Sequence, residues 1–143
     1  MKNELLAPAG NLESVKVVIN AGADAVYCSG VKFGARSFIT NLTDEDIIEA
    51  SKYVHLHGRK IYITVNTLIF EEEVEEVKTY IDFLYQYVDG LIVQDYGIVH
   101  YIRSTYPDFP VHLSTQTSIH TREDIVFLKI LGFRALFWLE KYQ

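Results

Sequence analysis

The sequence of 143 residues contains one cysteine, Cys28, and three prolines. A single cysteine excludes a disulfide within the chain. It also excludes an iron–sulfur cluster or a structural zinc site held by the chain's own thiolates. Because free thiols are usual in reducing compartments, a cytoplasmic location is expected. No apolar run approaches the roughly 18 residues of a membrane-spanning helix, so we expect no membrane partner.

Basic residues are also scarce. Thirteen Lys and Arg residues stand against nineteen Asp and Glu residues, which gives a net charge of −6. Without a basic stripe the chain does not resemble a self-sufficient nucleic-acid binder, although it could contribute to a site whose positive part lies elsewhere. The start, Met1 to Glu4, leads directly into an apolar segment, so no signal peptide is expected.

Two kinds of segment alternate along the chain. Short apolar segments, expected to be strands, are Glu4–Ala7, Asp24–Cys28, Lys60–Val65, Gly90–Val93, Pro110–Leu113 and Arg134–Leu139. Longer segments with helical spacing are Leu12–Ala21, Asp44–His57, Glu72–Tyr87, Gly97–Tyr106 and Arg122–Leu131. Strands separated by helices of this size indicate βαβ units and a parallel sheet.

Residues that favour helix ends flank these helical segments. Asn11, Thr43 and Thr121 precede helices as candidate N-caps, because their side-chain oxygens can accept a free backbone N–H of the first turn. Gly22 and Gly58 follow helices, where a left-handed backbone conformation is favoured. The acidic residues 71–73 are expected in the first turn of a helix, where the helix dipole favours carboxylates.

The spacing of the units predicts the fold class. Eight such units come to the roughly 250 residues of a (β/α)8 barrel, and this chain has room for five or six. We therefore predict an α/β fold: a partial TIM-type barrel with parallel strands, formed by residues 1–143 as a single domain. A doubly wound sheet is the alternative, but its usual Gly-rich first turn is absent. An open barrel exposes strand edges, so we expect self-association or docking on the missing barrel portion.

Polar side chains gather where the predicted strands end. In both architectures ligands bind beyond the carboxyl ends of the strands. Alternation places Tyr62, Thr64 and Asn66 on one face of the third strand, expected to point into the barrel, with the aliphatic face toward the helices. The same alternation on the fifth strand places His112, Ser114 and Gln116 on one face, opposite Val111 and Leu113. Buried polar groups need partners, so they form either a network or a ligand site.

Each of these candidates has two interpretations. Asn66, Gln94 and Gln116 either bind a ligand or bond the backbone at the strand ends. Asp95 serves in acid–base chemistry or caps the following helix. Arg36, in a Gly-flanked loop, holds a carboxylate or phosphate, or is an ordinary surface residue.

We assign candidate roles on this basis. The candidate catalytic residues are Asp95, Asn66 and Gln116, and the candidate substrate-binding residues are Arg36, Gln94, Ser114, Thr67 and Tyr27. No metal ligand is assigned, because His55 and His57 lack a third ligand nearby. Cys28 ends an apolar strand, which favours an inert buried thiol over a nucleophile.

Six short motifs stand in order along the chain: residues 4–10 (ELLAPAG), 22–27 (GADAVY), 33–36 (FGAR), 64–67 (TVNT), 92–95 (IVQD) and 112–116 (HLSTQ). Together they resemble the N-terminal region of the collagenase-like peptidase family, family 32 of the peptidases of unknown catalytic type. The resemblance implies a bacterial or archaeal cytoplasmic protein with a barrel-like catalytic domain.

Members of that family differ in activity, so the resemblance leaves three functions open. The first is the N-terminal part of a collagenase-like peptidase, acting on a peptide and inactivated by truncation. The second is a segment of an iron–sulfur-dependent enzyme that hydroxylates tRNA or rRNA; other relatives hydroxylate quinones without oxygen. In such relatives the cluster is held by downstream cysteines that this chain lacks, so no cofactor is assigned to it. The third is a non-catalytic small subunit or docking fragment.

Overall fold

The computed structural model describes residues 4–35, 41–117, 119, 121–130 and 135–136. Six parallel strands form one sheet: β1 (Leu6–Pro8), β2 (Ala25–Ser29), β3 (Lys60–Val65), β4 (Gly90–Val93), β5 (Val111–Leu113) and β6 (Ala135–Leu136). The helices between them are α1 (Leu12–Asn20), α2 (Asp44–Leu56), α3 (Val74–Tyr85), α4 (Tyr96–Thr105) and α5 (Arg122–Ile130). Two 3-10 turns, η1 (Glu71–Glu73) and η2 (Thr115–Thr117), precede α3 and α5.

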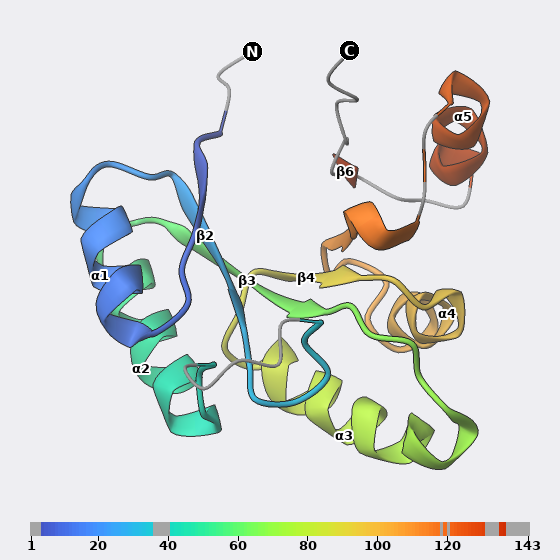
Figure 1. The fold of residues 1–143 in the computed structure, drawn as a ribbon, viewed down its shortest axis with the longest axis horizontal. Helices are drawn as coiled ribbons and strands as arrows, with labels where there is room; N and C mark the ends of the chain where they lie inside the picture. Colours follow the sequence, from blue (N-terminus) through green and yellow to red (C-terminus); the bar gives the residue numbers. More distant parts are fainter. Residues whose placement is uncertain (1–3, 36–40, 118, 120, 131–134, 137–143) are drawn as a thin grey trace.

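The order of the strands decides between the two predicted architectures. Each strand pairs in parallel with the next strand along the chain, from β1 to β6. A doubly wound sheet would reverse this order at a switch point, whereas a (β/α)8 barrel keeps it. The predicted α/β fold, a partial TIM-type barrel of five to six units, is confirmed. Figure 1 shows helices α1 to α4 following one another around the outer side of the strands.

The strands present different faces to the helices and to the interior. Ile61, Ile63 and Val65 of β3 are fully or almost fully buried in the main core, which also contains the buried side chains of α1 to α4. On the opposite face, Tyr62 packs with Ala25 and Ile92 in a smaller inner cluster. The predicted alternation on β3 is therefore confirmed, and it turns the polar side chains of this strand toward the inside of the ring.

Helix caps fix where the elements begin. Asn11 Oδ1 accepts the N–H of Ser14 at 2.8 Å. Thr43 and Asp46 form a reciprocal capping box with bonds of 3.0 and 3.1 Å. Gly22 and Gly58 have φ angles of +103° and +65°, as expected after a helix. The first strand is Leu6–Pro8 rather than the predicted Glu4–Ala7: the Leu5 carbonyl accepts both the Asp24 and the Ala25 N–H, and regular pairing with β2 begins at Leu6.

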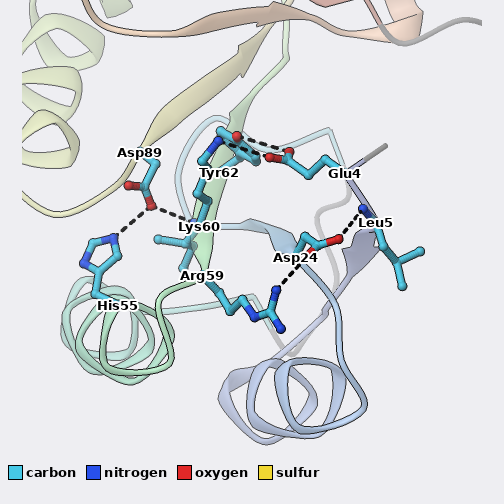
Figure 2. Close-up of polar contacts among 9 residues, drawn as sticks. Glu4, Leu5, Asp24, His55, Arg59, Lys60, Tyr62 and Asp89 are labelled. Atoms are coloured by element: carbon cyan, nitrogen blue, oxygen red, sulfur yellow. Dashed lines mark hydrogen bonds and ion pairs between the residues drawn. The ribbon is translucent and has the colours of Figure 1, made fainter. Parts of the chain in front are cut away.

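Two aspartates join neighbouring strands at their N-terminal ends (Figure 2). Asp24, just before β2, accepts the N–H of Leu5 at 3.0 Å and pairs with Arg59 at 2.5 Å. Asp89, just before β4, accepts the N–H of Ile61 and bonds His55 Nε2, both at 2.8 Å. Each carboxylate thus ties a neighbouring backbone to a cationic or imidazole side chain. These contacts hold the strands in register at the end of the barrel that serves stability.

Asp89→Ala should destabilise the fold because it removes the acceptor of two hydrogen bonds at once. We expect the free energy of unfolding to fall by about 1–2 kcal/mol, discounted for partial exposure. Urea denaturation measures the change. Asp108→Ala, at an exposed position before β5, is the matched control and should lie within about 0.5 kcal/mol of wild type. Equal losses in the two variants would contradict the assignment.

Gly30, directly after β2, lies against the buried phenol of Tyr80. A Cβ atom at position 30 would lie 2.1 Å from Tyr80 Oη, but 3.4 Å from the next nearest atoms. Tyr80 is 4% exposed, and its hydroxyl has no hydrogen-bond partner among the described residues. The hydroxyl alone therefore excludes a side chain at position 30.

Gly30→Ala should cost about 2 kcal/mol of stability, because a well-packed site resists an added methyl group. Adding Tyr80→Phe should restore most of that loss, since it removes the one atom in the way. Gly10→Ala, where no atom lies within 4 Å of the new Cβ, is the control. Thermal or urea unfolding of the three variants checks this, and a double variant no better than Gly30→Ala would refute it.

Candidate functional site

A cavity of about 430 Å³ opens at the carboxyl ends of the strands, where both predicted architectures place ligands. Its lining comes from five consecutive strand ends: Pro8, Ala9 and Gly10 after β1; Tyr27, Cys28 and Ser29 of β2, with Ala35 and Asn41 from the following loop; Thr64 and Asn66 of β3; Ile92 of β4; and Ser114, Thr115 and Gln116 after β5. The first five βα units therefore share one site.

Hydrogen bonds connect the polar lining across the strands. Ser29 Oγ lies 2.7 Å from Thr64 Oγ1, which joins β2 to β3. Asn66 Oδ1 accepts the N–H of Ala35 at 3.0 Å, and Asn66 Nδ2 donates to Ser114 Oγ at 3.3 Å. The Asn66 amide thus links the loop after β2 to the end of β5. The wall therefore carries two separate hydrogen-bonded groups, Ser29 with Thr64 and Asn66 with Ala35 and Ser114.

The loop after β2 is held in place by a residue with an unusual backbone. Phe33 has a φ angle of +54°, a backbone conformation that residues other than glycine rarely adopt. Its carbonyl oxygen accepts the N–H of Asn66 at 3.0 Å and the hydroxyl of Thr67 at 3.4 Å. Ala35, two residues later, then meets the Asn66 side chain. Backbone strain of this kind persists where surrounding contacts over-determine it, and it often marks functional sites.

Four of the predicted site residues meet in the cavity. Asn66, Gln116, Ser114 and Tyr27 line it together. Their assigned roles stay predictions.

The other predicted site residues lie elsewhere. Among the described residues, Gln94, Asp95 and Thr67 do not line the cavity. Asp95 Oδ1 accepts the N–H of Ile98 at 3.0 Å and is the N-cap of α4, its second predicted interpretation. Thr67 donates to the Phe33 carbonyl instead. Arg36 lies outside the described residues.

The sequence prediction assigned no role to two hydroxyls that join β2 to β3. Ser29 and Thr64 are not among the predicted site residues, yet both line the cavity. The signal was present: alternation along β2 places Ala25, Tyr27 and Ser29 on one face, as it does Tyr62, Thr64 and Asn66 on β3. Ala35 and Asn41 carried no such signal, because loop residues have no periodicity.

The lining is electrically neutral within the part of the chain that the structure describes. It contains amides, hydroxyls and apolar groups but no Asp, Glu, Lys, Arg or His side chain. Burial raises the pKa of the Cys28 thiol to about 12, so it is protonated near neutral pH and is a poor nucleophile. Burial also lowers the pKa of His112, which packs edge-on against Tyr62 with ring centroids 4.8 Å apart. Binding, rather than acid–base chemistry, is what this wall can do directly.

A serine, a histidine and an aspartate do meet at the opposite end of the strands. His55 bonds Asp89, and its Nδ1 lies 3.4 Å from Ser51 Oγ. Ser51 is 3% exposed, however, and its hydroxyl donates to the Tyr87 carbonyl. The arrangement therefore connects α2 to the turn before β4 and offers no accessible nucleophile.

The described residues do not fit an iron–sulfur cluster, because Cys28 is the chain's single thiol and is 2% exposed. Within those residues, no group of three His, Cys, Asp or Glu side chains is placed to hold a metal ion. None of their helices combines the length and apolar composition needed to cross a bilayer.

Cys28 should resist alkylation in the folded chain. With a pKa of about 12, the thiolate fraction at pH 8 is about 1 in 10,000, and burial blocks access further. We expect iodoacetamide to label native protein at least ~100-fold more slowly than protein unfolded in guanidinium. Mass spectrometry of timed samples measures both rates. Similar rates in the two states would show an accessible, reactive thiol.

Comparisons with curated proteins identify relatives that are named for different activities. The chain is 40% identical over 132 residues to tRNA hydroxylation protein P1 of Bacillus subtilis (strain 168), covering 92% of this chain and 31% of that protein. It is 42% identical over 134 residues to the 23S rRNA 5-hydroxycytidine C2501 synthase of Escherichia coli (strain K12), covering 93% and 20%. A protein named collagenase from Porphyromonas gingivalis (strain ATCC BAA-308 / W83) is 35% identical over 127 residues, covering 87% and 30%. The chain thus spans a third or less of each.

A solved structure and a family model complete the comparison. The structure of the U32 peptidase Mk0906 superposes with a TM-score of 0.75 at 13% identity, covering 95% of this chain and 59% of that one. That likeness shows the fold. The model of peptidase family U32 matches residues 10–137, nearly the whole chain. The chain therefore belongs to peptidase family U32.

Proposed function

We propose that this chain is the substrate-binding part of an RNA-hydroxylating enzyme, and that the cavity holds the nucleotide to be modified. The observation that carries the proposal is the neutral, hydrogen-bonding wall of the cavity, built from Ser29, Thr64, Asn66 and Ser114. Relatives named for tRNA hydroxylation and for 5-hydroxycytidine synthesis in rRNA support it.

The cavity suits a base that has been turned out of an RNA stack. Enzymes that modify bases read the flipped base by hydrogen bonds to its edge and by packing against its faces. A volume of about 430 Å³ lies within the usual range for small-molecule sites. Tyr27 and Ile92 supply apolar surface, and the wall supplies amide and hydroxyl groups.

The charge of the chain indicates what it cannot supply alone. RNA backbones are bound mainly by Lys and Arg side chains, and the net charge here is −6. We infer that cations for the backbone, and the oxidising chemistry, come from the remainder of a longer protein like the curated relatives. Arg36, which follows Ala35 in the sequence, is the local candidate for a phosphate contact. Gln94 and Thr67 stay candidate substrate-binding residues, and Asp95 stays a candidate catalytic residue. A single cytoplasmic domain also stays a prediction.

A peptidase is the second candidate, supported by the relative named collagenase. Peptide cleavage without a metal needs a nucleophile activated by a neighbouring base. Among the described residues, Ser29 and Ser114 face a threonine and an asparagine instead. This chemistry favours binding over peptide hydrolysis. The docking-fragment prediction is compatible with either, since β1 and β6 each pair with a single neighbour in the described sheet.

Disrupting the gene should remove a hydroxylated nucleoside from tRNA or rRNA, and a wild-type copy should restore it. We expect an Asn66→Ala copy to restore at most about a tenth of the wild-type level, because the loop after β2 and Ser114 both lose their partner. Mass spectrometry of nucleosides from digested RNA measures the level. Asn20→Ala, an exposed residue at the end of α1, is the control and should restore it fully.

Two results would overturn the proposal. One is an unchanged set of RNA nucleosides after gene disruption. The other is cleavage of gelatin by the purified protein that is lost in Asn66→Ala, since that would assign the cavity to a peptide.

A further inference from the structure

The hydroxyl of Ser114 is left with one unused function, a proton to donate. A serine hydroxyl offers one donor and two acceptor positions. Ser114 Oγ accepts from Asn66 Nδ2 and from the backbone N–H of Gln116, each at 3.3 Å. Both partners are donors, so both acceptor positions are in use. Among the described residues, no acceptor contacts the Ser114 proton.

The direction of these bonds does not depend on a choice of amide orientation. The backbone N–H of Ala35 can only donate, so the Asn66 atom that it meets must be the oxygen. The nitrogen of the same amide therefore faces Ser114. Because that nitrogen can only donate, Ser114 has to accept from it. The free proton of Ser114 is thus fixed by the fold, although the residue is only 4% exposed.

The neighbouring hydroxyls add to this excess of donors. Ser29 and Thr64 share one hydrogen bond at 2.7 Å, so one of their two protons is left over. Asn66 also keeps a second N–H, because the described contacts use only one. The partly buried wall therefore offers several neutral donors to whatever occupies the cavity.

The rest of the lining selects among ligands with acceptor groups. Ile92, 4% exposed, and the half-buried Tyr27 provide an apolar surface, and no charged side chain lies among the described lining residues. An anion would find no counter-charge there, whereas a neutral ring with carbonyl oxygens would meet donors and apolar surface together. The carbonyl edge of a pyrimidine base has this chemistry.

We propose that Ser114, oriented by Asn66, is a specificity-determining residue that donates its proton to a carbonyl oxygen of the substrate pyrimidine. This rests on the proposed function, which supplies the pyrimidine. In this proposal Ser114 recognises the edge of the base, and Asn66 positions the Ser114 hydroxyl. A peptide carbonyl is the competing acceptor, and the test separates the two.

The test replaces the acceptor on the ligand and the donor on the protein in turn. Uridine, 2-thiouridine and 4-thiouridine are titrated into the 143-residue chain by NMR, because sulfur is a weaker acceptor than oxygen. We expect one of the two thio-nucleosides to bind wild type about five- to tenfold more weakly than uridine. Ser114→Ala should bind uridine more weakly by a similar factor and lose the discrimination, as a double-mutant cycle requires.

Control experiments distinguish a failure of the Ser114 assignment from a failure of the proposed RNA function. Ser104→Ala, at an exposed position on α4, should bind all three nucleosides as wild type does, and the ligand-side change needs no variant that must fold. Discrimination that persists in Ser114→Ala overturns the Ser114 assignment, yet leaves the RNA proposal standing if gene disruption removes a hydroxylated nucleoside. Saturable, Ser114-dependent binding of N-acetyl-alaninamide in place of the nucleosides overturns the assignment in favour of a peptide. Failure of wild type to bind any nucleoside also overturns it.

Discussion

The side-chain amide of Asn66 connects two parts of the chain that are distant in sequence. Its oxygen holds the loop after β2 through Ala35, and its nitrogen holds Ser114 at the end of β5. The backbone of Asn66 also bonds Phe33, so both the side chain and the main chain anchor the same loop. A charged side chain here would bring an unbalanced charge into the site. An apolar one would leave the Ala35 N–H without its acceptor and Ser114 Oγ without the donor on Asn66. The shape of the cavity depends on this one amide.

Much of this arrangement could be predicted from strand periodicity. Alternation of Tyr62, Thr64 and Asn66 with aliphatic residues already fixed which side chains face the interior, and the structure places them so. The convergence of Asn66, Ser114 and Gln116 followed from the rule that parallel strands end at one mouth of the barrel. These predictions held because a parallel strand covered by helices must bury its aliphatic face, whatever the loops do.

Other contacts could not be predicted, because no periodicity encodes them. Asp95 stands at a strand end like Asn66, but a helix begins one residue later and its carboxylate caps that helix. The positive φ angle of Phe33 could not be predicted, because the residue at that position is not a glycine. The pairing of Asp89 with His55 needs the end of α2 to lie beside the turn before β4, which is a matter of tertiary packing. Local sequence gives the candidates, and the packing of helices on the sheet selects among them.

The two ends of the barrel use opposite chemistry. At the N-terminal ends of the strands, charged pairs such as Asp24 with Arg59 and Glu4 with Lys60 hold the register. At the carboxyl ends, the described cavity wall is neutral, and the hydrogen bonds of its side chains leave protons of Ser114 and Asn66 unused. At the first end, the charged groups of the described pairs are bound to one another. The unused hydrogen-bonding capacity is concentrated at the second end, in the proton of Ser114 above all, and a carbonyl-bearing neutral ligand would complete it.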